Sequence, residues 1–157
     1  MISEMLIFFG QYGIFLIIIV SLLNFKNEAK SLIALALSLA ISYGISAFFY
    51  VPRPFVAGKY SPLIPHSAST SFPSHHSSAG FALSFSTFNT NTILGLVSSA
   101  IAILMVIGRV YAGLHSNIDI IGGLLIGAFC AIFAYSRFTD NIIKKIVKKF
   151  KPKKHRK

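Results

Sequence analysis

Length, composition and charge limit the class of protein before any motif is considered. The chain has 157 residues, of which 54% are hydrophobic and 12% are charged, and its mean hydropathy of +0.70 excludes an ordinary water-soluble globule. Its one cysteine, Cys130, excludes an intrachain disulfide framework and a thiolate metal site. We therefore expect a single all-α integral membrane domain.

The first half of the chain contains two apolar stretches long enough to cross a bilayer, which takes about 20 helical residues. Residues 2–23 form the first predicted span, and residues 32–51 form the second. Pro52 and Pro54 end the second span, because proline lacks a backbone donor and disfavours helix in the residue before it. Residues 51–74, rich in proline and serine, are predicted to form a structured loop.

Three further helices are expected in the second half of the chain. A short span over residues 75–88 begins after Ser74, a favoured N-cap residue. A polar turn at residues 89–92 leads to a span over residues 93–111, and the last span covers residues 118–138. The predicted architecture is an integral membrane helical bundle of about five transmembrane helices.

Positive charge is unevenly placed along the chain and predicts the orientation of the bundle. With five spans, 12 of the 15 Lys and Arg residues fall on the side of the C-terminal tail, and only Arg53, Lys59 and Arg109 fall on the other side. Positive residues accumulate on the cytoplasmic side of membrane proteins. We therefore expect the C-terminus in the cytoplasm and the side that carries these three residues outside.

The basic tail is expected to be separate from the membrane domain. We assign residues 1–140 to the transmembrane domain and residues 141–157 to a cytoplasmic tail. Such a tail can attract anionic lipids by about 1 kcal/mol for each basic residue near the surface. Nucleic acid is not an expected partner, because no aromatic stacking platform accompanies these charges.

The few polar residues suited to chemistry gather at the ends of the predicted spans. Arg53 stands between two prolines, and its planar guanidinium can grip two phosphate oxygens. The pair Pro73-Ser74 opens a helix whose free backbone amides and positive dipole end suit an anion, and His76 in the first turn can reach the same anion. Polar groups at these positions in so apolar a chain predict a phosphate-handling site at one face of a bilayer.

A third polar group combines an arginine, a histidine and a carboxylate. His115 follows Arg109 by six residues, and Asp119 follows His115 by four. If His115 and Asp119 share the first turn of the last span, their side chains lie on one helix face and can meet. A carboxylate that accepts one imidazole N–H leaves the other ring nitrogen free to attack, so this spacing predicts a nucleophile.

These three groups, in this order, resemble the signature of the type 2 phosphatidic acid phosphatase (PAP2) superfamily of membrane phosphatases. That signature reads Lys-x6-Arg-Pro, then Pro-Ser-Gly-His, then Ser-Arg-x5-His-x3-Asp. The matching segments of this chain are Arg53-Pro54, Pro73-Ser74-x-His76 and Arg109-x5-His115-x3-Asp119. The flanking Pro-Arg-Pro-Phe-Val and Ser-Phe-Pro-Ser-x-His segments further resemble the BcrC-type undecaprenyl-diphosphatases, bacterial enzymes that recycle the lipid carrier of the cell wall.

The resemblance implies a two-step reaction at these residues. His115 would attack the terminal phosphorus and form a phosphohistidine, while Asp119 would stabilise the resulting imidazolium. His76 would protonate the leaving oxygen and then deprotonate the attacking water. The phosphate oxygens would be held by three residues, Arg53, Arg109 and Ser74.

No cofactor or metal is expected. The chain has only four acidic residues, and just Glu4 and Asp119 fall on the outer side, too few for a Mg²⁺ or two-metal cage. The expected partners are a lipid phosphate and the bilayer itself, and the expected location is the inner (cytoplasmic) membrane of a bacterium, with the site facing outward.

The chain departs from the family signature at two phosphate-binding positions. Ser46 stands where the signature has a lysine, and His75 stands where it has a glycine. Lys59 in the loop could replace the missing cation. His75 could crowd the anion, supply an extra donor for a diphosphate, or face solvent.

We expect a phosphatase that removes the terminal phosphate of undecaprenyl diphosphate. The alternative enzyme acts on phosphatidate, phosphatidylglycerol phosphate or a lipid A phosphate. A noncatalytic lipid-binding or transport protein that keeps the anion pocket is the alternative of a different class, and the absence of the lysine favours it.

Overall fold

The computed structural model describes residues 1–24, 28–59 and 61–150. Within these ranges the chain forms seven helices and no strand, which confirms the all-helical prediction. The helices are α1 (Ile2–Leu22), α2 (Glu28–Phe48), α3 (Pro54–Ala57), α4 (His75–Phe88), α5 (Thr92–Tyr111), α6 (Asn117–Ala134) and α7 (Arg137–Phe150). Lys26 and the cations from Lys151 onward, on which the predicted orientation partly rests, lie outside the described residues.

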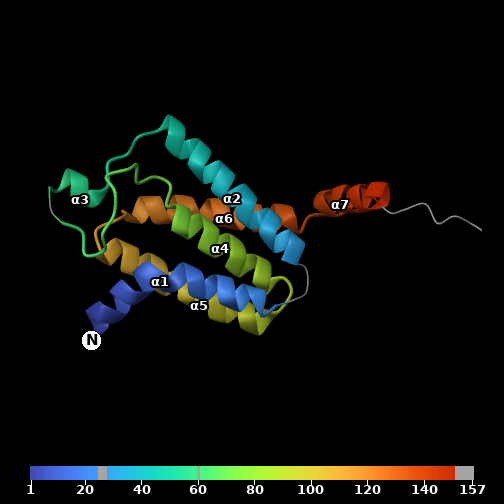
Figure 1. Ribbon diagram of the computed structural model, residues 1–157, viewed down its shortest axis with the longest axis horizontal. Coiled ribbons are helices and arrows are strands. Elements are labelled where there is room, and N and C mark those ends of the chain that lie inside the picture. The colour runs from blue at the N-terminus through green and yellow to red at the C-terminus, as the bar shows by residue number, and fades with distance from the viewer. Residues whose placement is uncertain (25–27, 60, 151–157) are drawn as a thin grey trace, which may run out of the picture.

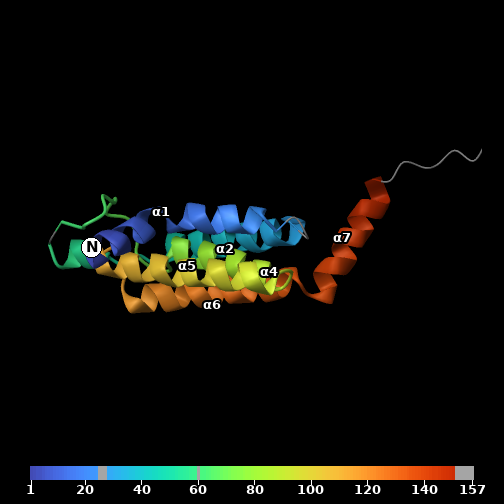
Figure 2. The same cartoon turned by 90° about the horizontal axis from the view of Figure 1, so that it is seen from below.

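Helices α1, α2, α4, α5 and α6 run alternately in opposite directions through one bundle (Figures 1 and 2). The N-terminus, α3 and the α5–α6 connection lie at one end, whereas the α4–α5 turn and α7 lie at the other. Four of these helices are long and apolar enough to cross a membrane: α1, residues 29–48 of α2, α5 and α6.

Helix α4, the remaining predicted span, is the short inner helix of the bundle. Its 14 residues extend for about 21 Å at about 1.5 Å per residue, less than the hydrocarbon core of about 30 Å. It packs against α2, α5 and α6, and most of its side chains are buried. The two serines in its first turns are bonded within the protein: Ser42 Oγ donates to Ser78 Oγ at 2.7 Å, and Ser77 Oγ donates to the Ile120 carbonyl at 2.8 Å. The helix is therefore sheltered from lipid by its neighbours.

Two glycines of α6 allow α4 and α6 to pack closely. A Cβ atom on Gly123 would lie 2.6 Å from the carbonyl oxygen of Ser74, and one on Gly127 would lie 2.6 Å from that of Ser78. Both obstacles are backbone atoms, which cannot rotate away. This contact fixes the start of α4, where the polar residues of the chain converge.

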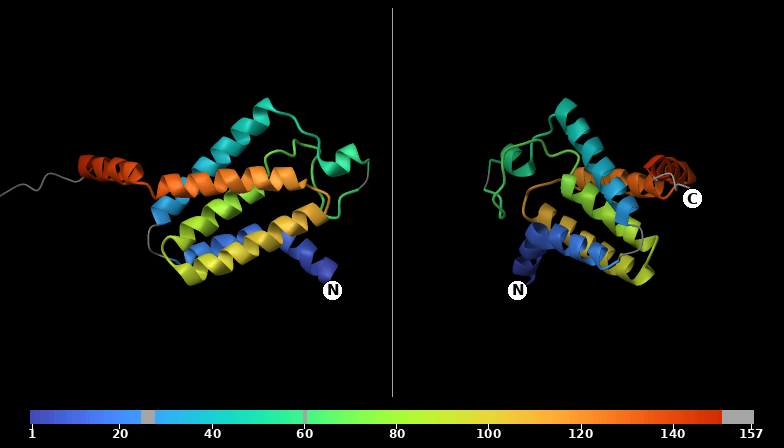
Figure 3. Two further views of the ribbon diagram at one scale, coloured as in Figure 1. Left: turned by 180° about the vertical axis from the view of Figure 1, so that it is seen from behind. Right: turned by 45° about the vertical axis from the view of Figure 1, so that its right-hand side comes forward.

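The last predicted span, residues 118–138, is too long. Helix α6 ends at Ala134, and Ser136 then caps α7 by accepting the Thr139 N–H at 3.4 Å. Helix α7 leaves the bundle at the end opposite to α3 (Figure 3). The first turn of α7 is tied to α2 by an ion pair between the Lys30 ammonium of α2 and Asp140 of α7 at 2.6 Å.

The close approach of α4 and α6 predicts the effect of adding one methyl group. We expect Gly127→Ala to lower the free energy of unfolding by about 1–3 kcal/mol, because the added Cβ forces two backbones apart. Gly44→Ala in α2 is the matched control, since nothing lies within 4 Å of a Cβ at that position. The control should be neutral or slightly stabilising. Thermal unfolding of both variants in detergent checks the prediction, and equal midpoints would contradict it.

Candidate active site

A cavity of about 510 Å³ lies at the end of the bundle that carries α3. Among the residues that line it, none is Asp or Glu. Six are basic: Arg53, His66, His75, His76, Arg109 and His115. A cavity of this composition in a low-dielectric protein favours an anionic ligand.

Separate elements bring these basic side chains together. Arg53 is the N-cap of α3, His76 lies in the first turn of α4, and Arg109 lies in the last turn of α5. His115 stands in the connection between α5 and α6. That connection turns at Gly113, whose positive φ of 76° favours glycine, and the Gly113 carbonyl accepts the N–H of Phe55 at 3.2 Å. The turn thus ties the His115 segment to α3.

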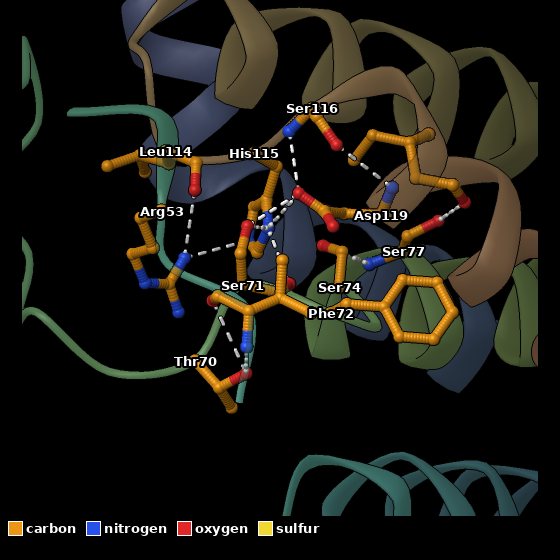
Figure 4. A network of polar contacts seen from close by, with 12 residues as sticks. Arg53, Thr70, Ser71, Phe72, Ser74, Ser77, Leu114, His115, Ser116 and Asp119 are labelled. Atoms are coloured by element: carbon orange, nitrogen blue, oxygen red, sulfur yellow. Dashed lines mark hydrogen bonds and ion pairs between the residues drawn. The ribbon is translucent and has the colours of Figure 1, made fainter. Parts of the chain in front are cut away.

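The hydrogen bonds of His115 define its tautomer (Figure 4). Nδ1 lies 3.0 Å from the carbonyl oxygen of Ser71, which can only accept, so Nδ1 carries the proton. Nε2 lies 3.2 Å from Nη1 of Arg53, which can only donate, so Nε2 presents a lone pair. His115 is therefore held as a neutral imidazole whose Nε2 carries a lone pair.

Burial keeps His115 neutral. Its side chain is 3% exposed, and burial lowers the pKa of His115 to about 4, although the nearby Asp119 carboxylate acts in the opposite direction. Burial also lowers the pKa of Arg53 from its ordinary value. A neutral histidine beside two guanidinium groups is the form required for attack on phosphorus.

Asp119 supports His115 differently from the sequence prediction. His115 precedes α6 instead of sharing its first turn, and its Nδ1 lies 3.7 Å from Asp119 Oδ2, an ion-pair distance longer than a hydrogen bond. Oδ2 instead accepts from Ser71 Oγ at 2.5 Å and from the Ser116 N–H at 2.6 Å. The second bond closes a capping box at the start of α6, which takes up the carboxylate. Asp119 thus positions Ser71, whose carbonyl oxygen orients the imidazole.

The two arginines are anchored by protein carbonyls and keep donors available. Arg53 donates from Nη1 to the Leu114 carbonyl at 3.0 Å, and Arg109 donates from Nη1 to the Gly10 carbonyl at 3.1 Å. The Nε–H groups of both arginines are buried, and neither has a hydrogen-bond partner within the described part of the chain. Because both arginines line the cavity, their positive charge suits an oxyanion such as a phosphoryl group.

The structure places the other residues considered for phosphate binding differently from one another: Ser74, His75 and Lys59. Ser74 is buried behind the cavity wall and caps α4, where its Oγ accepts the Ser77 N–H at 3.4 Å. His75 lines the cavity, and its Nε2 lies 3.0 Å from Ser46 Oγ. Lys59 is exposed just beyond α3 and is not among the lining residues, so the structure does not bring it to the site.

Sequence reasoning missed two serines that hold the site together. Ser69 Oγ accepts from Nη2 of Arg53 at 3.1 Å, and Ser71 joins His115 to Asp119. His66 also lines the cavity from the loop. The only sequence feature that pointed to these loop residues was their position between two predicted site residues, Arg53 and Ser74. Across the described ranges, no group of three or more His, Cys, Asp or Glu side chains is arranged to hold a metal ion.

The fold and the cavity define a multi-pass membrane protein with an anion site at one end of a helical bundle. Residues 27–143 match the model of the PAP2 superfamily, and the chain belongs to that superfamily. The resemblance inferred from the three sequence motifs is thereby confirmed.

Curated relatives and solved structures agree with this membership. The chain is 34% identical over 102 residues to undecaprenyl-diphosphatase BcrC of Bacillus subtilis (strain 168), covering 65% of this chain and 52% of the relative. It is 37% identical over 100 residues to the putative undecaprenyl-diphosphatase YbjG of Escherichia coli (strain K12), covering 62% of this chain and 50% of the relative. The chain therefore spans about half the length of the curated relatives it matches.

Two solved structures share the fold. LpxE of Aquifex aeolicus superimposes with a TM-score of 0.66 at 25% identity, covering 85% of this chain and 82% of that one. The first transmembrane PAP2 type phosphatidylglycerolphosphate phosphatase from Bacillus subtilis gives a TM-score of 0.62 at 20% identity, covering 96% of this chain and 79% of that one. The predicted membrane bundle is confirmed by both.

The hydrogen bonds of His115 predict its titration. With a pKa near 4, well below the ordinary value of 6.5, the ring should stay neutral and protonated on Nδ1 as the pH falls from 7 to 5. An unfolded chain would take up this proton near pH 6.5, so His115 should also make the fold less stable as the pH falls from 6.5 toward 4.

Nitrogen NMR of histidine-labelled protein in detergent checks this prediction, with His115→Gln to assign the signal. A ring that gains its second proton near pH 6.5, or that carries its proton on Nε2, would contradict it.

Proposed function

We propose that the chain is a lipid phosphatase that removes the terminal phosphate of undecaprenyl diphosphate through a phosphohistidine, without a metal ion. The observation that carries this proposal is the neutral His115, whose unprotonated Nε2 lies in a cavity with two buried arginines. A nucleophile without a proton to lose can attack phosphorus directly.

In the first step, Nε2 of His115 attacks the terminal phosphorus, and the bond from that phosphorus to the bridging oxygen breaks. His76, in the same cavity, gives a proton to the leaving oxygen of the lipid monophosphate. The His115 ring becomes positively charged. The Ser71 carbonyl at 3.0 Å and the Asp119 carboxylate at 3.7 Å both stabilise that charge.

In the second step, water attacks the phosphohistidine. His76 takes a proton from this water, the nitrogen–phosphorus bond breaks, and inorganic phosphate leaves while His115 returns to its neutral form. The arginine side chains Arg53 and Arg109 stabilise the equatorial oxygens in both steps, with donors already directed by their carbonyl anchors. The free backbone amides at the start of α4 add to this stabilisation.

The names of the two curated relatives support undecaprenyl diphosphate as the substrate, since both are called undecaprenyl-diphosphatases. The cavity of about 510 Å³ is within the usual range for a small-molecule site. Phosphatidate, phosphatidylglycerol phosphate and lipid A phosphates carry the same reacting group. They are the competing substrates in the test below.

We propose further that the cavity faces outward from the inner membrane of a bacterium and that the C-terminus is cytoplasmic. The described basic residues of α7 lie at the opposite end of the bundle from the cavity. Positive charge accumulates on the cytoplasmic side, where these residues can attract anionic lipids. Residues 1–140 would then act as the phosphatase domain and residues 141–157 as a membrane-surface tail.

The mechanism predicts metal-independent hydrolysis that depends on His115. Purified protein in detergent with EDTA should release phosphate from undecaprenyl diphosphate, and His115→Ala should reduce kcat by at least about 10³-fold. His115→Gln preserves the ring volume more closely, and Lys145→Gln, on α7, is the control that should leave the rate unchanged. Equal rates for wild type and both His115 variants would refute the mechanism. Lipid binding by the wild type without phosphate release would favour the noncatalytic alternative.

The orientation predicts which sites a membrane-impermeant thiol reagent reaches. In a Cys130→Ala background, a cysteine at Lys59 should react in intact cells, and one at Lys145 should react only after the cells are opened. The Cys130→Ala protein without a new cysteine is the control for background labelling. Labelling of the Lys145 position alone in intact cells would reverse the orientation.

A further inference from the structure

The wall of the cavity formed by α2 and α4 carries polar groups that the two-step mechanism does not use. Ser46 and Tyr43 lie one helical turn apart on α2, and both contact His75 at the start of α4. Ser46 Oγ donates to the Phe72 carbonyl at 3.1 Å and lies 3.0 Å from His75 Nε2. A hydroxyl has only one proton, so Ser46 accepts the Nε2–H of His75.

These contacts fix the His75 ring and leave its second nitrogen available. The ring packs against Tyr43 with centroids 4.1 Å apart, while Nε2 is held by Ser46. Among the described residues, Nδ1 of His75 makes no hydrogen bond of normal geometry, although the Ser42 carbonyl of α2 also lies close to the ring, and the half-buried ring lines the same cavity as His115. An adjacent anion favours the imidazolium form, in which Nδ1 also donates.

The polar groups of the cavity lie on two walls. Arg53, which contacts His115 at 3.2 Å, belongs to the wall formed by the loops and α5. His75 and Ser46 belong to the wall formed by α2 and α4. A single phosphoryl group needs only the first wall, which already contains the nucleophile and two arginines. A diphosphate has a second phosphate group that needs a partner of its own.

An apolar groove indicates which phosphate lies at which wall. This groove, of about 230 Å³, shares Tyr43, His75 and His76 with the polar cavity, and its remaining walls are the apolar side chains Ile14, Ile18, Leu35, Leu39 and Ala79. It lies between α1 and α2, which diverge in the views of Figure 3. His75 and His76 line both the groove and the cavity, whereas His115 lines only the cavity. A lipid chain in this groove would therefore bring its own phosphate to the side of His75 and leave the terminal phosphate to reach His115.

We propose that His75, held by Ser46 and Tyr43, forms a second phosphate subsite that binds the phosphate remaining on the lipid and makes the site selective for diphosphates over monophosphates. This proposal rests on the phosphatase function proposed above. Because His75 stands where the superfamily signature has a glycine and Ser46 where it has a lysine, the two departures from that signature form one contact.

Kinetics with two substrates test the subsite. His75→Ala should raise KM for undecaprenyl diphosphate about tenfold, the effect of one charge-assisted hydrogen bond, with kcat within about threefold of wild type. The kinetic constants for phosphatidate should stay within about twofold. Ser46→Ala, which removes only the hydrogen bond that holds the His75 ring, should raise KM for undecaprenyl diphosphate by less than His75→Ala does. His75→Gln, which keeps a hydrogen-bond donor, should bind this substrate more tightly than His75→Ala.

Losses of the same size with both substrates would show a structural role for His75 and would overturn the proposal. Unchanged constants with both substrates would overturn it as well.

Calorimetry with inorganic pyrophosphate and inorganic phosphate separates this proposal from the proposed function, because it requires no turnover. The wild-type protein should bind pyrophosphate more tightly than phosphate, and His75→Ala should remove that difference while leaving phosphate binding within about twofold. If the wild type hydrolyses no lipid but shows this difference, the proposed function fails and the subsite stands. If it hydrolyses lipid but His75→Ala binds pyrophosphate like the wild type, the subsite fails alone.

Discussion

The hydrogen bonds of Asp119 hold the catalytic end of this protein together. The carboxylate accepts from Ser71 Oγ and from the Ser116 N–H, while the backbone carbonyl of the same residue accepts the Ser74 N–H at 3.1 Å. One residue therefore joins the start of α6, the loop that follows α3, and the start of α4. The orientation of His115 depends on this junction, because its Nδ1–H is bonded to the carbonyl of Ser71.

A short, polar inner helix explains how a membrane protein places such a junction inside its bundle. Helix α4 is buried by α2, α5 and α6, so Ser77 and Ser78 bond to protein groups and its N-terminus opens into the cavity instead of lipid. Glycines on α6 bring the two backbones into contact at Ser74 and Ser78. Packing and chemistry therefore depend on the same contact, and a change that separates α4 from α6 would also displace the residues around His115.

Much of this arrangement was predictable from local sequence patterns. Hydrophobic length predicted the spans, and the spacing of His115 and Asp119 predicted that their side chains would meet on one face of the last span. The predicted hydrogen bond between the His115 ring and the Asp119 carboxylate is absent from the structure, where the two groups lie 3.7 Å apart. The capping box at the start of α6 uses that carboxylate instead. Local patterns could not reveal the contact of Ser46 with His75, which joins residues 29 positions apart and depends on how α2 packs on α4.

The central claim is that Nε2 of His115 is the atom that attacks phosphorus, and covalent trapping tests it most directly. Wild-type protein and His76→Ala would be mixed with undecaprenyl diphosphate carrying a radiolabelled terminal phosphate, quenched in alkali and mapped by mass spectrometry. The account predicts label on His115 in the wild type. In His76→Ala, which lacks both the proton donor of the first step and the base of the second, the label should form and decay more slowly but still on His115. Phosphate release with no labelled protein in either sample, or label on any other residue, would contradict it.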